Sequence, residues 1–202
     1  MEDSVKIVGI AGLPRSGKDS LGELFVDAGF YAVSFGEIFR DYSRKRHADK
    51  PDPISIANMT ETANWLRTEH GPDVALKEAL RRYKDRLDAG EKYAGLLFIS
   101  IRAPIEVDFI LQHGGELIWV QTDDKVRYER NNEHRREGET ELSFEEFLSQ
   151  EALQSNPQPG TPEEAQMNTT YVRSKATKSL ENNGNDFDDF KIRGKTLVDE
   201  VI

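Results

Sequence analysis

The sequence contains no cysteine among its 202 residues. Disulfides and thiolate metal sites are therefore excluded, and this composition fits a cytoplasmic protein. The four histidines are scattered without the spacing of metal ligands, so we expect isolated histidines at the surface. No run of 18 apolar residues is present, which argues against a membrane span. The first apolar run follows acidic rather than basic residues, which argues against a secretory signal.

Basic residues are the minority among the charged ones. The chain has 27 Lys and Arg against 37 Asp and Glu, a net charge of −10. Broad nucleic-acid binding needs clustered positive charge, so we do not expect a nucleic-acid partner. Lys and Arg cluster only locally, at 40–46 and 127–136. This pattern suits a small phosphate-bearing ligand better than a duplex.

Short apolar runs alternate with helical patterns along the chain. The length fits one domain with a single core. We predict an α/β fold, with a parallel five-stranded sheet and helices on both faces. The predicted strands are 5–11, 31–35, 96–101, 116–121 and 175–181. The predicted helices are 20–28, 37–46, one after "KPDP" (50–53) to about 69, one from 72, 104–112, 123–136, 143–153 and 186–201.

The first strand leads into "GLPRSGKDS", residues 12–20. Its first seven letters fit the phosphate-binding loop G-x-x-x-x-G-K-[ST]. Backbone N–H groups of such a loop curl around a phosphate, and the next helix directs its positive end at it. An ordinary glycine turn is the alternative, but the flanking strand and amphipathic helix favour the loop. We therefore predict ATP binding by Gly12, Pro14, Arg15, Ser16, Gly17, Lys18, Asp19 and Ser20, with Lys18 acting in catalysis.

The eighth position of the loop is Asp19, where Ser or Thr is expected. A carboxylate is a hard oxygen ligand that can hold magnesium directly or through water. Alternatively, Ser20 supplies the hydroxyl and Asp19 stabilises the start of the helix. Asp19 and Ser20 are thus the candidate metal ligands, and the expected cofactors are ATP and Mg²⁺.

The "SGKD" loop is similar to that of phage deoxynucleoside monophosphate kinases and animal-type phosphomevalonate kinase. Over most of its length the chain resembles archaeal dephospho-CoA-kinase-like and adenylate-kinase-like proteins of the P-loop nucleoside-monophosphate-kinase superfamily. The pieces that carry this resemblance are "GIAGLPRSGKD", "VSFGEIFRDYSRKR", "WLRTEHGPDVALKEAL", "IRAPIEVDFI", "VRYERNNEHRR" and "ENNGNDFDDF". The resemblance implies one P-loop kinase domain over 1–202, with a helical acceptor-binding segment at 36–90 and a lid-like segment at 123–165.

The segment "SFGEIFR" (34–40) resembles the S/T-G-D-x-x-R stretch of adenylate kinases. This resemblance implies that Arg40 binds the phosphate of the acceptor and that Glu37 lies near the acceptor or the metal. The two residues are three apart on a helix and therefore share a face. A surface ion pair is the alternative.

The stretch "ISIRAPIE" (99–106) follows a central strand. The resembled families carry an Asp before the Arg, as "DGIR" or "D-x-R", but here those places hold Ile99 and Ser100. The planar fork of Arg102 suits a phosphate, so we predict that Arg102 binds the acceptor and acts in catalysis. The missing carboxylate leaves the general base open, although a phosphate acceptor needs little deprotonation.

Four arginines lie in the charged helix after the fourth strand, at 127, 130, 135 and 136. The resemblance implies a lid that brings arginines onto the transferring phosphate, and we name Arg127 and Arg130 as catalytic candidates. A solvated, salt-bridged helix face is the alternative. The resemblance also places the turn at 182–184 near the base of the donor, although a plain turn explains that sequence equally well.

These observations together predict an ATP-dependent phosphotransferase with a small phosphorylated acceptor, foremost a nucleoside or deoxynucleoside monophosphate. One alternative is a kinase of dephospho-CoA or phosphomevalonate. Dephospho-CoA presents a hydroxyl and needs a base, which the absence of an Asp at 99–100 disfavours. The other alternative is a nucleotide-dependent ATPase or binding protein without kinase activity.

Overall fold

The computed structural model describes residues 5–51, 53–54, 56–134, 141–155, 166–184 and 186–202. The strands form one parallel five-stranded sheet in the order β2-β3-β1-β4-β5. They span β1 Lys6–Ala11, β2 Phe30–Ser34, β3 Gly95–Ile101, β4 Glu116–Gln121 and β5 Lys178–Glu181. The predicted parallel five-stranded sheet is confirmed.

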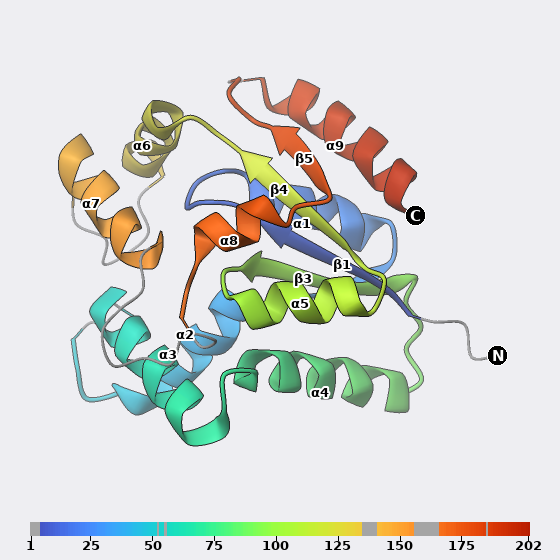
Figure 1. Cartoon of the computed structure of the whole chain (residues 1–202), viewed down its shortest axis with the longest axis horizontal. Coiled ribbons are helices and arrows are strands. Elements are labelled where there is room, and N and C mark those ends of the chain that lie inside the picture. The colour runs from blue at the N-terminus through green and yellow to red at the C-terminus, as the bar shows by residue number, and fades with distance from the viewer. Residues whose placement is uncertain (1–4, 52, 55, 135–140, 156–165, 185) are drawn as a thin grey trace.

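Helices cover both faces of this sheet (Figure 1). One face packs against α1 Lys18–Asp27 and α9 Phe187–Val201. The other face packs against α2 Phe35–Arg46, α3 Ile56–His70, α4 Val74–Asp88, α5 Pro104–Gln112 and α8 Thr169–Ser174. Figure 1 shows α6 Asp124–Glu133 and α7 Phe144–Ser155 beyond the end of the sheet toward which the strand arrows point.

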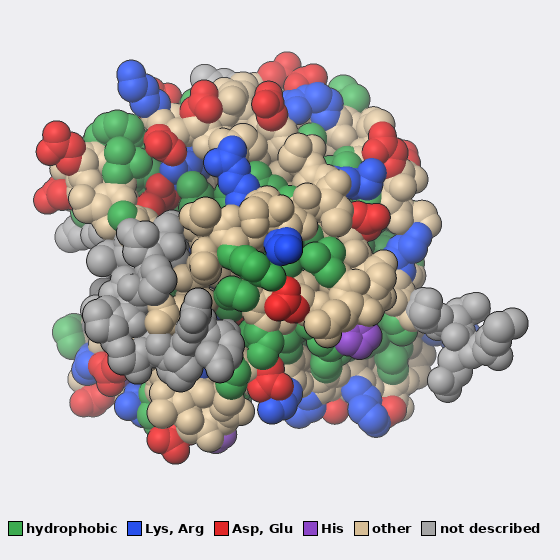
Figure 2. Space-filling model, viewed as in Figure 1, with side chains coloured by type: hydrophobic (Ala, Val, Ile, Leu, Met, Phe, Trp, Pro, Cys, Tyr) green, Lys and Arg blue, Asp and Glu red, His purple; other side chains and the backbone are tan. Residues whose placement is uncertain are grey.

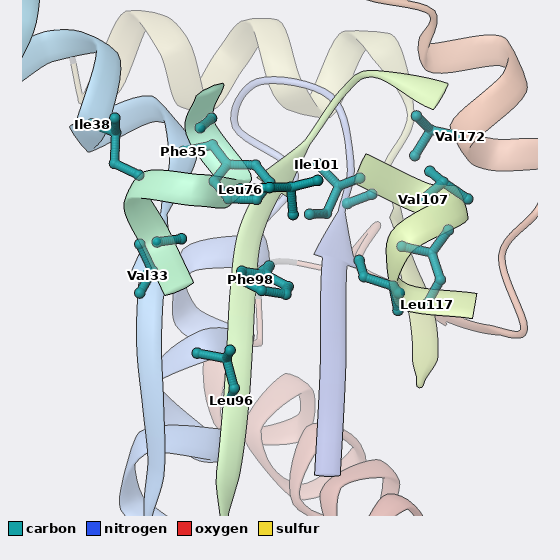
Figure 3. Close-up of a cluster of buried hydrophobic side chains, with 14 of the residues drawn as sticks. Val33, Phe35, Ile38, Leu76, Leu96, Phe98, Ile101, Val107, Leu117 and Val172 are labelled. Carbon is teal, nitrogen blue, oxygen red and sulfur yellow. The ribbon is translucent and has the colours of Figure 1, made fainter. Parts of the chain in front are cut away.

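Strand residues alternate between the two cores because successive side chains point to opposite faces. In β1, Ile7 belongs to one core and Val8 to the other. Both faces are buried, so the strands read as nearly continuous apolar runs. Figure 3 shows side chains from several elements meeting in one of these cores, among them Phe98 of β3, Val107 of α5 and Leu117 of β4.

A bulge interrupts β3 near its carboxyl end. Ile10 of β1 pairs with Ile99, but the next residue, Ala11, pairs with Ile101. Ser100 is therefore the extra residue, and its φ of 69° lies in the left-handed region that non-glycine residues rarely adopt. The bulge returns Ile101 to the core and leaves Ser100 at the edge where the strands end.

Three sequence expectations need correction. The helix α8 was not expected, and the last strand begins at Lys178 rather than at 175. His47 is buried, at 4% exposure, although surface histidines were expected. Arg135, Arg136 and the loop at 156–164 lie outside the described residues. No described helix is long and apolar enough to span a membrane.

Candidate active site

The carboxyl ends of the strands bring the predicted site residues to one edge of the sheet. Gly12 follows β1, Arg102 follows β3, Thr122 follows β4 and Asn182 follows β5. All strands are parallel, so these residues share the edge at which α/β proteins bind their ligands.

The two glycines of the predicted phosphate-binding loop stand where a side chain would not fit. A Cβ on Gly12 would lie 2.6 Å from Ser16 Oγ and 2.9 Å from the Val120 carbonyl oxygen. Gly17 has φ +94°, and a Cβ there would lie 2.3 Å from Asn182 Nδ2. The loop therefore needs glycine at both positions of the motif. At Gly12 the neighbouring atoms leave no room for a Cβ, and at Gly17 both the lack of room and the left-handed backbone conformation require glycine.

Two buried side chains hold the loop from outside. The carbonyl oxygen of Ser16 accepts hydrogen bonds from Thr122 Oγ1 at 3.0 Å and from Asn182 Nδ2 at 2.8 Å. Neither residue was predicted to support the loop. The loop is thus fixed by side chains from the ends of β4 and β5.

The interior of the loop fits a phosphate. Ser16 Oγ is buried and finds no hydrogen-bond partner among the residues that the structure describes. An unsatisfied buried hydroxyl costs about 1–3 kcal/mol, which a ligand oxygen would recover. Lys18 is only 6% exposed at the start of α1, and a buried ammonium is stabilised by an anion. Asp19 and Ser20 lie in the first turn of the same helix, Asp19 exposed and Ser20 half-buried.

Arg127 is buried beneath the loop, at 1% exposure. Its guanidinium forms ion pairs with Glu151 of α7 and Asp124 of α6, and lies over the ring of Phe147. It also donates to the Pro14 carbonyl oxygen at 3.3 Å. Burial lowers the pKa of Arg127, but the hydrogen bonds and charges of its two acids raise it overall. This arrangement is that of a residue that supports the loop.

Arg130 joins the loop to the turn after β5. Its guanidinium donates to the carbonyl oxygens of Arg15 at 3.5 Å and Gly184 at 2.8 Å, and to Asn182 Oδ1 at 3.3 Å. Burial lowers its pKa, with Glu133 acting in the opposite direction. The predicted turn at 182–184 therefore lies against both the loop and α6.

The predicted acceptor residues lie at the start of α2. Glu37 and Arg40 form an ion pair, and their acceptor role stays a prediction. Three polar side chains lie around Gly36. A Cβ there would lie 3.6 Å from Ser34 Oγ, 3.8 Å from Arg40 Nη2 and 4.0 Å from Ser100 Oγ. The bulged residue of β3 thus faces the start of α2.

Arg102 links this region to the loop. Burial lowers its pKa, the Glu106 carboxylate raises it, Arg40 and Arg67 lower it further, and Asp19 raises it. Arg102 thus interacts electrostatically with Asp19 of α1 and with arginines of α2 and α3. These groups belong to the two sides of the site that the sequence predicts.

Glu106 is a buried carboxylate at the start of α5, 3% exposed. Its Oε2 accepts hydrogen bonds from the backbone N–H groups of Arg102 at 2.8 Å and Ala103 at 3.0 Å. Burial raises its pKa, while the charge of Arg67 and then those N–H groups lower it. Glu106 thereby fixes the backbone that carries Arg102.

Arg67 of α3 is a member of this cluster that the sequence analysis missed. It is 6% exposed, and its guanidinium carbon lies 4.9 Å from the centre of the Phe39 ring. Burial lowers its pKa, and Glu106 raises it. Its position on the stripe of Ala63 and Leu66, both buried, is the signal that could have identified it, because a charged residue on an apolar stripe needs a reason.

The sequence was compared with known families and proteins. No family model matches the sequence. A UPF0200 protein of Pyrobaculum aerophilum is 30% identical over 146 residues, which cover 71% of this chain and 74% of that protein. A UPF0200 protein of Methanococcus vannielii is 28% identical over 152 residues, which cover 73% of this chain and 76% of that protein.

Solved structures share the architecture across the whole chain. TT1252 from Thermus thermophilus matches with a TM-score of 0.57 and 21% identity, covering 99% of this chain and 100% of that one. A shikimate kinase from Bacteroides thetaiotaomicron matches with a TM-score of 0.55 and 12% identity, covering 98% of each chain. The fold is therefore that of the P-loop kinases.

Proposed function

The chain belongs to the UPF0200 family, and from the site that it carries we propose that it transfers the γ-phosphoryl group of ATP to a small phosphorylated acceptor. The observation that carries this proposal is the position of Arg102. The charge of Asp19, in the predicted loop, raises the pKa of Arg102, and the charges of Arg40 and Arg67, from α2 and α3, lower it. A phosphate-binding loop thus adjoins a second group of cations suited to a second phosphate.

The donor would lie along residues 12–20. The buried Lys18 is suited to the charge on the β- and γ-phosphates, and the glycine turns leave room for the chain of phosphates. Asp19 and Ser20 would hold magnesium, whose charge neutralises phosphate oxygens during transfer. Arg130, tied to the carbonyl oxygen of Arg15, would stabilise the same end of the site.

The acceptor would lie near Arg40 and Arg102, with 36–90 as its binding segment and 123–165 as a lid-like segment. Nucleoside or deoxynucleoside monophosphates are the foremost acceptors, on the resemblance to their kinases. An oxygen of the acceptor phosphate forms a bond to the γ-phosphorus, the bond to the β–γ bridging oxygen breaks, and ADP leaves. A phosphate monoester has a second pKa of about 6, so this oxygen is already ionised at neutral pH.

The end of β3 supports a phosphate acceptor over an alcohol. An alcohol needs a general base to remove its proton. The place of the family carboxylate holds Ser100, whose hydroxyl lies near Arg40 across Gly36. Dephospho-CoA as acceptor is disfavoured for this reason, whereas phosphomevalonate remains an acceptor of suitable chemistry.

The proposal is tested by measuring ADP formation from Mg-ATP with a panel of acceptors. The panel holds ribo- and deoxynucleoside monophosphates, dephospho-CoA and phosphomevalonate. Turnover is expected with one class of phosphorylated acceptor and should be abolished in Lys18→Ala. Lys84→Ala, which removes an exposed lysine of α4, should leave it unchanged. Tight ATP binding without acceptor-dependent turnover would contradict a kinase and favour a nucleotide-dependent binding protein.

A further inference from the structure

We infer that Arg67 is a third acceptor-binding arginine, and that with Arg40 and Arg102 it forms a site for a dianionic phosphate group. The inference rests on the proposed function, because that proposal assigns Arg40 and Arg102 to the acceptor rather than to ATP. Its binding test, however, requires no turnover.

The first argument is the state of the Arg67 side chain. It is 6% exposed, yet its guanidinium makes no hydrogen bond or ion pair with any residue in the described part of the chain. No nitrogen of Arg67 is among the fully buried polar atoms that lack a partner, so those of its five N–H donors that have no protein acceptor keep contact with solvent. An anionic ligand at this opening would complete their hydrogen bonds.

The second argument is how Arg67 is held. Its guanidinium lies over the ring of Phe39, so α2 supports a side chain that comes from α3. A cation over an aromatic ring is stabilised by the negative face of the ring. This contact uses none of the N–H donors of Arg67, which stay available for the oxygens of a phosphate.

The third argument is charge. The charge of Arg67 lowers the pKa of Arg102, and the buried carboxylate of Glu106 raises the pKa of both arginines. Its Oε2 is already engaged by two backbone N–H groups. Glu37 and Asp19 are exposed, so solvent screens their charges. Adding Arg40 leaves an excess of positive charge that a dianion balances better than a monoanion.

The test uses the full chain with ADP bound, so that the phosphate-binding loop is occupied. Inorganic phosphate is titrated in by calorimetry, with formate as the monoanionic comparison. We expect phosphate to bind and formate to bind at least tenfold more weakly. Arg67→Met should weaken phosphate binding by about tenfold or more. Arg193→Met, which removes an arginine of α9 on the opposite face of the sheet, should leave it unchanged. Equal phosphate affinity in wild type and Arg67→Met would overturn the inference.

A second measurement uses the wild-type protein and is therefore independent of whether Arg67→Met folds. In the ¹⁵N-labelled wild-type protein, the Nε–H signal of Arg67, assigned with Arg67→Lys, should shift when phosphate is added. A signal that stays in place at saturating phosphate would overturn the inference.

Kinetics separate this inference from the proposed function. Phosphate binding that depends on Arg67, without turnover on any acceptor, would support the site and refute the kinase. Acceptor-dependent turnover whose acceptor KM is the same in Arg67→Met would support the kinase and overturn the role of Arg67. A raised acceptor KM with an unchanged ATP KM would support both.

Discussion

Gly17 controls the junction between the loop and α1. An alanine there would keep the backbone at φ +94° and place its Cβ 2.3 Å from Asn182 Nδ2. The left-handed conformation alone costs about 1–2 kcal/mol for a residue with a Cβ. Displacing Asn182 would also break its hydrogen bond to the Ser16 carbonyl oxygen. We expect Gly17→Ala to lower the free energy of unfolding by more than the conformational cost and to weaken ATP binding, measured by urea denaturation and calorimetry.

Gly90 provides the matched control for this prediction. Its φ of +88° is nearly the same, but a Cβ there would meet nothing within 4 Å. Gly90→Ala should therefore show the conformational cost alone, about 1–2 kcal/mol, with unchanged ATP binding. Equal effects of the two substitutions would contradict the proposed packing of Asn182 against the loop.

Single residues were predictable from the sequence where a motif names them. The loop glycines have a fixed spacing, and their expected role is to let the backbone come close to its neighbours. In the structure a Cβ at either glycine would lie too close to neighbouring atoms, as this role requires. Asn182 lies 166 positions from the carbonyl group that it holds, so no local pattern could have paired the two. Arg67 was missed because its importance arises from α2 and α5, which come next to it only in the fold.

At the scale of elements, Arg127 ties α6 and α7 to the loop. The sequence offered a lid residue or a solvated salt-bridged face, and the structure gives an ion pair that is buried. Removing one partner of a buried pair leaves the other charge unpaired, which costs about 3–5 kcal/mol. We expect Arg127→Met to destabilise the protein by that amount and to weaken ATP binding, because the Pro14 carbonyl oxygen loses its donor.

The double variant Arg127→Met/Glu151→Met checks this explanation. Removing both charges takes away the buried carboxylate of Glu151, and the remaining partner of Arg127, Asp124, is exposed to solvent, so much of the lost stability should return in thermal denaturation. ATP binding should stay weak, since the donor to Pro14 is still absent. A double variant less stable than Arg127→Met would contradict the ion-pair account.

An ion-pair network joins α2 to α4. Glu78 binds Arg81 and Arg82, and Arg82 reaches Asp41 of α2. The hydrogen bond from Arg81 is the largest influence on the pKa of Glu78, and burial opposes it. The hydrogen bond from Arg82 and the charges of both arginines then lower this pKa from 4.5 to about 2. The folded state therefore releases this proton more readily than the unfolded state. The resulting stability is present above pH 4.5 and is lost as the pH falls toward 2.

Glu78→Gln should accordingly be less stable than the wild type at pH 7. The cost should be about 1 kcal/mol, because solvent screens the charges of Arg81 and Arg82, whose side chains are 59% and 30% exposed. The difference should shrink as the pH falls from 4.5 toward 2, measured by urea denaturation across that range. A difference that stays constant with pH would contradict the assigned pKa.

Elements with strong local signals were predicted well. The capping box at the start of α7 is present, with the Glu146 N–H donating to Ser143 Oγ at 3.2 Å and Glu146 Oε2 accepting from the Ser143 N–H at 2.7 Å. The helix α8 was missed because six residues are too few to show a helical period. Its start depends on Asn168, whose side chain accepts a hydrogen bond from the Tyr171 N–H and whose own N–H donates to the Arg102 carbonyl oxygen.

At the scale of the whole molecule, the architecture followed from alternation of strands and helices. The sheet and its two covered faces agree with that prediction. Charge was informative at this scale as well. Figure 2 shows acidic and basic side chains interspersed over one face of the molecule, in keeping with a net charge of −10. The predicted acceptor rests on the family resemblance alone, because the proposed acceptor site takes its residues from α2, α3 and the end of β3, which no local pattern connects.

The most direct test of the central claim compares acceptors that differ only in one phosphate. ADP formation from Mg-ATP is measured with each nucleoside and with its monophosphate, alone and with Lys18→Ala. We expect turnover with a monophosphate, none with the matching nucleoside, and none in the variant. Turnover with the nucleoside, or hydrolysis of ATP at the same rate without any acceptor, would contradict the proposal that this protein transfers phosphoryl groups to a phosphate.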